Sequence, residues 1–324
     1  MKAAAADLDA VCRTMRGETE VALAVHDKPD PDALGAAAGM LDLFGRLGVA
    51  AALYVDPHQT LPLEDLLLGG RRVLRTDPPA SLRIYALDCG AAPRLALAAA
   101  PASVAVNIDH HHDNPGYGEL NLIRGSASST CEIVCDLFSA ISLEPGEAAA
   151  TALYAGISFD SGHFHHGSTS AHTFACASWL AGLGVDVTAV YGDLYERRSA
   201  GALRLWARAV QGAEEVAGGR ALVASVARGD YAACGAGEEE TEGIVESLRA
   251  VEGVEAAALV KEQSSGARVR VSLRSHALDV STIAALCGGG GHRLAAGFSS
   301  DDSPEEVRAW LSSELARRLS TESS

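Results

Sequence analysis

Short apolar segments alternate with segments of helical spacing through the first half of the chain. Each apolar segment has the length of a strand and is rich in β-branched or aliphatic residues. Strands separated by helices favour parallel pairing, so the pattern predicts an α/β fold with a doubly wound parallel sheet. The expected strands are 21–25, 51–55, 84–87, 104–108 and 154–159, and the expected helices are 33–47, 93–100 and 129–141.

The second half of the chain predicts a different order of strands, turns and helices. Gly218-Gly219 lies between two short strand-like segments and predicts a hairpin turn. Further strands are expected at 256–260 and 269–273, and helices at 239–250, 279–286 and from 304 to about 319, so this half predicts a smaller α/β domain. A long helix over 187–210 is expected to join the two domains. The predicted ranges are 1–192 for the first domain, 193–205 for the helical linker and 206–324 for the second domain.

The charge of the chain bears on its partners. The net charge is −16 at pH 7. Proteins that bind long nucleic acid by counterion release normally present a basic face. We therefore expect no long duplex nucleic acid as a partner, and any nucleic-acid substrate to be short. No apolar run is long enough to span a membrane, so we expect no membrane partner.

The seven cysteines are scattered and form no CxxC pair. Cys131 and Cys135 are one helical turn apart, a spacing more typical of core packing than of metal ligation. An odd number of cysteines without a framework pattern is typical of a reducing compartment. The expected location is therefore the cytoplasm.

The first group of chemically capable residues begins where the first predicted strand stops. In the segment His26-Asp27-Lys28-Pro29-Asp30-Pro31-Asp32, one imidazole and two carboxylates come from His26, Asp30 and Asp32. Open α/β sheets bind their ligands at this carboxyl edge. The two prolines keep the loop extended, so residues 30 and 32 can face different metal ions. An acidic turn in which Asp32 caps the following helix explains the same residues.

Carboxylates also follow the later predicted strands. Asp88 follows the strand at 84–87, Asp109-His110-His111 follows the strand at 104–108, and Asp160 is expected at the end of the strand at 154–159. An isolated Asp in such a position is usually a helix cap, but several at one sheet edge repel one another unless cations neutralise them. Oxygen and imidazole donors suit manganese. The sequence therefore predicts a metal site at this edge.

The order HxxxDxD, a lone strand-end Asp, DHH and a further Asp resembles the DHH phosphoesterase superfamily. Residues 269–275, the run Gly288 to His292 and the segment 295–298 resemble the DHH-associated substrate domain. The resemblance spans nearly the whole chain. Its compact size is most similar to the branch of nanoRNases and 3′,5′-bisphosphoadenosine phosphatases.

This resemblance implies a hydrolase that holds two manganese ions per chain, with magnesium or cobalt as substitutes, and uses them to activate the attacking water. Asp88 would bridge both ions and act in catalysis. His111 would donate to a phosphate oxygen or protonate the leaving oxygen. The implied ligands are His26 and Asp30 for one ion, Asp32, His110 and Asp160 for the other, and Asp88 for both.

In the second domain the resemblance implies a clamp for a second phosphate. Backbone amides of the glycine run can approach an anion because no side chain intervenes, and basic side chains add charge-assisted donors. The alternative is a helix that ends in flexible glycines, with Arg274 solvated. The implied substrate-binding residues are His111, Arg274, Ser275, Gly289, Gly290, Gly291 and His292.

The resemblance leaves three substrate classes as expectations. The leading class is short oligoribonucleotides together with 3′,5′-bisphosphonucleotides, and the second is cyclic or linear dinucleotides. The third, inorganic pyrophosphate, is disfavoured by residues 269–298. The oligomeric state is undetermined, and a homodimer is one allowed form. No role is assigned to four further histidines, His112, His163, His165 and His166.

Overall fold

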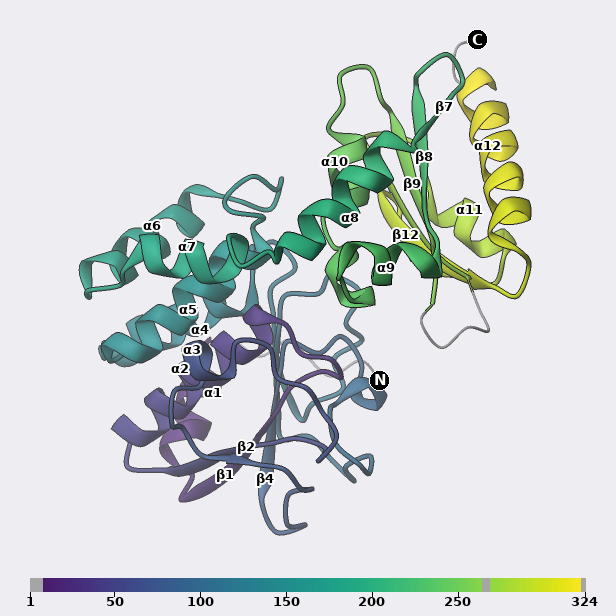
Figure 1. The fold of residues 1–324 in the computed structure, drawn as a ribbon. Coiled ribbons are helices and arrows are strands. Elements are labelled where there is room, and N and C mark those ends of the chain that lie inside the picture. Colours follow the sequence, from purple (N-terminus) through teal and green to yellow (C-terminus); the bar gives the residue numbers. More distant parts are fainter. Residues whose placement is uncertain (1–7, 264–268, 322–324) are drawn as a thin grey trace. The chain divides into compact units, whose positions relative to one another are not determined.

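The computed structural model of the protein describes residues 8–263 and 269–321. The chain forms two compact units, Met1–Glu196 and Arg197–Ser324. Each unit has its own six-stranded sheet and its own buried core (Figure 1). The predicted fold class, a parallel α/β domain followed by a smaller α/β domain, is confirmed.

The sheet of the first unit consists of six parallel strands in the order β3-β2-β1-β4-β5-β6. The sequence order reverses between the neighbours β1 and β4. In open α/β sheets such a reversal leaves a crevice at the carboxyl ends of the two strands, where ligands bind. The strands are β1 Glu20–Ala24, β2 Ala50–Tyr54, β3 Val73–Leu74, β4 Arg83–Leu87, β5 Val106–Asp109 and β6 Leu120–Ile123.

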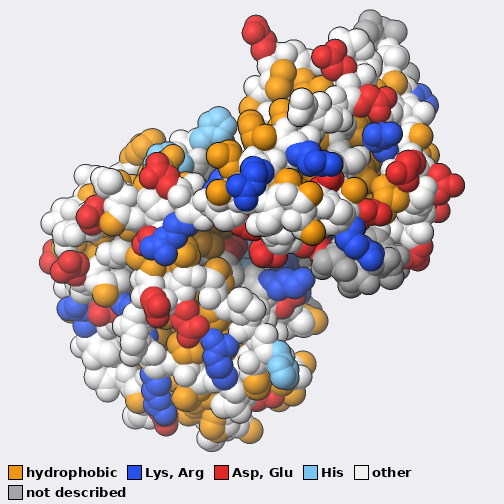
Figure 2. Space-filling view, viewed as in Figure 1, with side chains coloured by type: hydrophobic (Ala, Val, Ile, Leu, Met, Phe, Trp, Pro, Cys, Tyr) orange, Lys and Arg blue, Asp and Glu red, His pale blue; other side chains and the backbone are white. Residues whose placement is uncertain are grey.

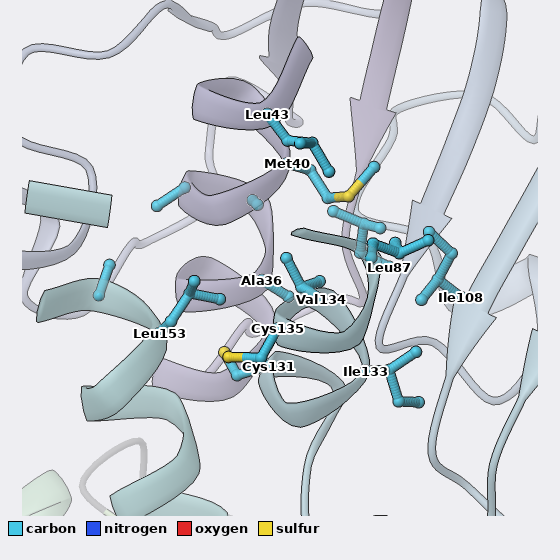
Figure 3. Close-up of a cluster of buried hydrophobic side chains, with 14 of the residues drawn as sticks. Ala36, Met40, Leu43, Leu87, Ile108, Cys131, Ile133, Val134, Cys135 and Leu153 are labelled. Atoms are coloured by element: carbon cyan, nitrogen blue, oxygen red, sulfur yellow. The ribbon is translucent and has the colours of Figure 1, made fainter. Parts of the chain in front are cut away.

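Helices build the main core on one face of this sheet. Side chains of α2 and α4 meet Leu87 of β4 and Ile108 of β5 there, and Leu153 of α5 completes the cluster (Figure 3). Among the described residues no single helix is long and apolar enough to cross a membrane, and α6 and α7 reach that length only as a pair bent by 115°. The helices are α1 Leu8–Arg16, α2 Pro31–Arg46, α3 Glu64–Leu67, α4 Thr130–Ile141, α5 Glu147–Asp160, α6 Ala171–Gly182 and α7 Val187–Tyr195.

The prediction of a helix over 93–100 is wrong. Only a 3₁₀ turn forms, η1 Ala92–Arg94, and the backbone becomes extended at Leu95. The Ala96 N–H donates to the Val25 carbonyl oxygen at 2.8 Å. This bond ties the segment to the residues that follow β1, so its backbone groups are satisfied by a long-range partner instead of by a helix.

The prediction of a strand over 154–159 is also wrong, because these residues belong to α5. Nearly all of them are buried. A short apolar run buried on several sides has the same sequence pattern in a helix as in a central strand, so periodicity does not separate the two. Asp160 is consequently the last residue of a helix and does not follow a strand.

The single helix predicted over 187–210 is two helices. α7 ends at Tyr195, and α8 (Ala200–Gln211) begins after four residues of different conformation. Ser199 starts α8 as its N-cap, since its side chain accepts a hydrogen bond from the Ala202 N–H at 2.9 Å. The boundary between the two units, after Glu196, falls in this interruption.

The second unit contains a mixed sheet in the order β11-β12-β10-β9-β8-β7. β8 and β9 are parallel, and the other neighbours are antiparallel. The hairpin predicted at Gly218-Gly219 joins β7 to β8 and is confirmed. The strands are β7 Glu214–Val216, β8 Ala221–Val226, β9 Ala256–Glu262, β10 Val269–Ser275, β11 Gly290–His292 and β12 Ala295–Ser300.

Two hydrophobic clusters cover the two faces of this sheet, one with α11 and α12 and the other with α8, α9 and α10. The helix predicted over 239–250 is interrupted at Gly243, whose φ of 83° lies in the left-handed region and breaks the helix. It consists of η2 Glu238–Thr241 and α10 Ile244–Arg249. The other helices are α9 Arg228–Cys234, α11 Ser281–Leu286 and α12 Pro304–Thr321.

Close packing of α2 on α5 can be tested with one glycine. A Cβ atom on Gly35 would lie 2.4 Å from the carbonyl oxygen of Ala152. We expect Gly35→Ala to lower the free energy of unfolding by about 1–3 kcal/mol through overpacking. Gly45→Ala in the same helix, where a Cβ meets nothing within 4 Å, should raise it by about 0.5–1 kcal/mol. Urea denaturation measures both variants, and equal effects would contradict the packing argument.

Candidate active site

The predicted metal-binding residues gather at the carboxyl edge of the first sheet, at the reversal between β1 and β4. His26 follows β1, Asp88 follows β4 and His110 follows β5, while Asp160 reaches the same place from the end of α5. In each of two groups, the donor atoms lie within 4.8 Å of one another. These groups are His26 with Asp30 and Asp88, and Asp32 with His110 and Asp160.

The imidazole of His26 faces two carboxylates. Its Nε2 lies 3.7 Å from Asp30 Oδ2 and 3.6 Å from Asp88 Oδ2. Its Nδ1 lies 2.8 Å from the carbonyl oxygen of Asp27. A ring that donates from Nδ1 to this carbonyl leaves Nε2 available as a metal ligand.

Asp30 serves both the helix and the site. Its Oδ1 caps α2 by accepting hydrogen bonds from the N–H groups of Asp32 and Ala33, so the cap is Asp30 and not Asp32 as the alternative interpretation proposed. Its Oδ2 lies on the side of His26. Helix capping and metal binding therefore use different oxygens of one carboxylate.

Asp32 is completely buried and is held by the first turn of α4. Its Oδ2 accepts from the Thr130 N–H at 2.7 Å, and its Oδ1 accepts from the Cys131 N–H at 2.9 Å. A helix N-terminus favours negative charge at this position. α5 passes directly beside it, because a Cβ on Gly156 would lie 2.3 Å from Cys131 Sγ and 3.0 Å from Asp32 Oδ1. Only glycine fits there.

Asp88 lies between the two groups. Its Oδ2 faces His26, while its Oδ1 lies 3.5 Å from Nε2 of His110. The same His110 nitrogen lies 3.0 Å from Asp160 Oδ2. The hydroxyl of Thr130 donates to Asp88 Oδ1 at 3.0 Å. The φ of Asp88 is 52°, a left-handed conformation that is uncommon outside glycine and that concentrates at functional sites.

The electrostatics of these groups favour a cation. Burial, followed by the charges of Asp88 and Asp160, raises the pKa of Asp32 well above its ordinary value, and burial raises the pKa of Asp160. Burial alone would lower the pKa of both histidines, but their carboxylate neighbours raise it to about 11 for His26 and about 10 for His110. Positive charge is thus stabilised at both ring nitrogens that face the carboxylates. The nitrogen and oxygen donors fit a divalent cation such as Mn²⁺.

His111 lies beside the metal-binding groups and is oriented by Asp109. Its Nδ1 lies 2.7 Å from Asp109 Oδ1 and 3.7 Å from Asp88 Oδ1. The bond to Asp109 raises the pKa of His111. It uses Nδ1, so Nε2 is the ring nitrogen that takes no part in this bond. Asp109 is fully buried, and its other oxygen accepts from Nδ2 of Asn114.

Sequence reasoning assigned no separate function to Asp109 or Thr130. The signal for Asp109 was its place at the end of a buried strand, since a buried carboxylate needs partners. Thr130 opens a predicted helix, where a hydroxyl usually caps. Its bond to Asp88 joins residues 42 positions apart, which local pattern does not encode.

The four unassigned histidines lie in two loops. His163 packs against the rings of Tyr191 and Tyr195. Nδ1 of His166 lies 3.1 Å from the carbonyl oxygen of Asp160. The side chains of His112 and His165 are exposed.

The second unit has a cavity of about 780 Å³ between β10 and the glycine run. Arg270, Ser272 and Arg274 alternate along β10 with buried apolar residues, so their side chains share one face of the strand. Arg274 forms an ion pair with Glu246, with 2.9 Å between Nε and Oε1. At Gly290 a Cβ would meet nothing within 4 Å, so its backbone borders open space.

The structure brings most, but not all, of the predicted clamp residues to this cavity. Gly289, Gly290, Gly291 and Arg274 line it, whereas Ser275 and His292 are not among its lining residues. The predicted substrate role of Ser275 does not fit the structure, because its side chain is completely buried and donates to the carbonyl oxygen of Leu278. Arg270 lines the cavity and was missed, although the alternation in Val269 to Leu273 is the signal that could have found it.

Comparison with known proteins agrees with this geometry. Residues 20–157 match the DHH family, N-terminal domain, and residues 218–320 match the DHHA1 domain. The bifunctional oligoribonuclease and PAP phosphatase NrnA of Thermus thermophilus is 29% identical over 309 residues, which cover 93% of this chain and 91% of that protein. The probable bifunctional oligoribonuclease and PAP phosphatase NrnA of Streptococcus mutans is 30% identical over 284 residues, which cover 85% and 87%.

A solved structure has the same fold. The exopolyphosphatase-related protein of Bacteroides fragilis has a TM-score of 0.83 and 21% sequence identity, covering 95% of this chain and 94% of that one. At this identity the likeness shows the fold alone. The two domain matches and the relative that is 30% identical over most of its length confirm the resemblance predicted from the sequence, and the chain belongs to the DHH family of phosphoesterases.

Proposed function

We propose that the protein hydrolyses short oligoribonucleotides and 3′,5′-bisphosphonucleotides, including 3′,5′-bisphosphoadenosine to AMP, and that it does so with two manganese ions. The observation that carries this proposal is the pair of donor groups that meet at Asp88, one with His26 and one with His110. The substrates are those named for the relatives that match nearly the whole chain, oligoribonucleotides and PAP.

Each ion has its own ligands in this proposal. His26 and Asp30 would hold one ion, and Asp88, whose two oxygens face different histidines, would contribute to both. When bound, two divalent cations supply Lewis-acid activation of a water and of the phosphoryl oxygens. Asp32, His110 and Asp160, whose donor atoms lie within 4.8 Å of one another, would hold the other ion.

His111 is the proposed proton donor. Asp109 accepts from Nδ1 at 2.7 Å, which fixes the plane of the ring and leaves Nε2 to donate to a phosphate oxygen or to the leaving oxygen. A third of its side chain is exposed, 32%, so substrate can reach it. Asn114 in turn donates to Asp109 and keeps that carboxylate in place.

The cavity of the second unit is proposed to bind a second phosphate. Arg270 and Arg274 supply positive charge on one face of β10, and the backbone at Gly290 supplies close approach to an anion. A phosphate would compete with Glu246 for Arg274, because both are anionic acceptors. His292 ends the glycine strand β11 and stays a proposed donor from the sequence resemblance alone.

Charge sets the length of the substrate. On the face shown in Figure 2, Lys and Arg side chains lie singly among Asp and Glu side chains, and the net charge is −16. Such a surface gives little counterion release along a strand. Affinity must then come from local contacts to a few nucleotides.

Removal of the shared ligand tests the metal proposal. Mutation of residues that only support metal ligands already lowers metal affinity or activity by about 10–100-fold. Asp88→Ala removes a ligand itself, so it should reduce activity by more than about a hundredfold. Manganese content, measured by elemental analysis after gel filtration, should fall as well. Asp113→Ala, an exposed acid near the same histidines, should leave both unchanged. Full turnover by Asp88→Ala without divalent ions would refute the proposal.

Substrate length gives an independent test. We expect the hydrolysis rate in one salt concentration to fall steeply between a dinucleotide and a strand of about thirty nucleotides, since longer strands gain no further contacts with an acidic surface. Rates are measured on end-labelled RNA, beside 3′,5′-bisphosphoadenosine, cyclic dinucleotides and pyrophosphate. Equal rates at all lengths would contradict the expectation, and preference for cyclic dinucleotides would reassign the substrate class.

Variants of the cavity arginines test whether the second unit binds substrate while the first unit carries out hydrolysis. Arg270→Ala and Arg274→Ala should each raise KM for 3′,5′-bisphosphoadenosine by about tenfold to a hundredfold, the loss of one charge-assisted contact. Hydrolysis of bis-p-nitrophenyl phosphate, which has no second phosphate, should change much less, and manganese content should not change. Arg228→Ala, an exposed arginine outside the cavity lining, is the matched control. Equal losses on both substrates would show that these arginines serve the structure instead.

A further inference from the structure

A second group of metal-binding side chains lies in the first unit, and it shares no residue with the active site. It consists of Asp136 on α4 and His172 and Cys176 on α6, whose donor atoms lie within 4.8 Å of one another. A cavity of about 460 Å³ opens beside it and is lined by all three residues together with Cys135. The three donor side chains thus border one space.

The contacts within this group are direct. Nε2 of His172 lies 2.8 Å from Asp136 Oδ1 and 3.7 Å from Cys176 Sγ. His172 and Cys176 are four positions apart on α6 and therefore project from the same face of the helix. The thiol of Cys135 hydrogen-bonds to Cys176 and lowers the pKa of the Cys176 thiol, with His172 adding to the effect. The group therefore offers a thiol with a lowered pKa beside an imidazole and a carboxylate.

Neighbouring residues hold the ligand atoms in place. Arg124 pairs with Oδ2 of Asp136, which leaves Oδ1 directed at His172. Thr173, which follows His172 on α6, donates its hydroxyl to Glu132 on α4 at 2.7 Å and fixes α6 against α4. Support of ligands by such outer contacts is typical of metal sites.

The spacing suits a tetrahedral ion. Metal–sulfur distances of about 2.3 Å and metal–nitrogen distances of about 2.0–2.1 Å place the two donor atoms about 3.6 Å apart at a tetrahedral angle. The observed separation of Cys176 Sγ and His172 Nε2 is 3.7 Å. Asp136 and His172 would separate by about half an ångström when an ion replaces the hydrogen bond between them. The exposed imidazole, with 52% of its side chain accessible, gives an ion a path from solvent.

We propose that Asp136, His172 and Cys176 form a zinc site distinct from the active site, with a solvent water as the fourth ligand. Thiolate and imidazole donors select zinc, whereas the oxygen-rich active site suits manganese. On binding, the proton of the Cys176 thiol passes to solvent, and His172 binds through Nε2 as a neutral imidazole whose proton is on Nδ1. Three bonds form between the ion and the protein, and one forms to water.

The site would join α4 to α6 at a functionally important place. The first turn of α4 carries the N–H groups that hold Asp32 and the hydroxyl that bonds Asp88, and Cys135 and Asp136 lie in the same helix. A bound zinc ion therefore stabilises the helix that supports the active site, without contacting substrate.

Cobalt spectroscopy tests the proposal, because cobalt replaces zinc and only thiolate ligands give it an intense near-ultraviolet charge-transfer band. Metal-free protein in a non-chelating reductant is titrated with Co²⁺ and then with Zn²⁺. We expect the band to rise to a plateau that matches one thiolate-bound cobalt per chain, even where cobalt also enters the active site. The band should be retained in Asp88→Ala and Cys131→Ser, and lost in Cys176→Ser and His172→Ala. His172 is largely exposed, so its variant reports on the site even where Cys176→Ser does not fold.

Thermal unfolding supplies a second measurement. In the Asp88→Ala background, one equivalent of zinc should raise the unfolding midpoint, and addition of His172→Ala should abolish that shift. A folded wild-type protein without the band overturns the proposal. So does a band that persists in both Cys176→Ser and His172→Ala, or one that is lost in Cys131→Ser, whose thiol lies next to Asp32.

Discussion

Two backbone hydrogen bonds from the first turn of α4 to Asp32 determine where the acidic residues of the first unit can meet. A carboxylate with no exposed surface is costly unless it has partners, and the N–H groups of Thr130 and Cys131 provide them. α5 can approach this point only because residue 156 is glycine. The loops after β1, β4 and β5 then reach the same anchor, since parallel neighbours end at one edge of a sheet.

Three residues of this site make their supporting contacts through atoms that the metal-binding groups do not need. Asp30 caps α2 with one oxygen and faces His26 with the other. His26 uses one ring nitrogen for the backbone and directs the second at the carboxylates. Asp109 orients His111 without entering either group. Rigid placement of this kind lowers the cost of ordering ligands when an ion binds.

Much of this arrangement could be predicted from the sequence, because strand ends carry the chemistry and strand order follows from the alternation with helices. Asp160 was placed at the right edge for the wrong local reason, since a helix buried on several sides resembles a strand in its pattern. Other features depend on partners far along the chain. The bond from Ala96 to Val25 prevents a helix, and the burial of Ser275 removes it from the cavity. Arg270 is different, because its signal was local and was overlooked.

The alternation along β10 has a consequence for how this family can diversify. Arg270, Ser272 and Arg274 face the cavity because Val269, Val271 and Leu273 face the core of the second unit. Insertion or deletion of one residue within the strand would exchange the two sets, burying arginines and exposing the apolar residues. Ligand preference at this cavity can therefore change by replacement of side chains, but not by a change in strand length. The register of β10 therefore determines both the residues that line the cavity and the folding of the second unit.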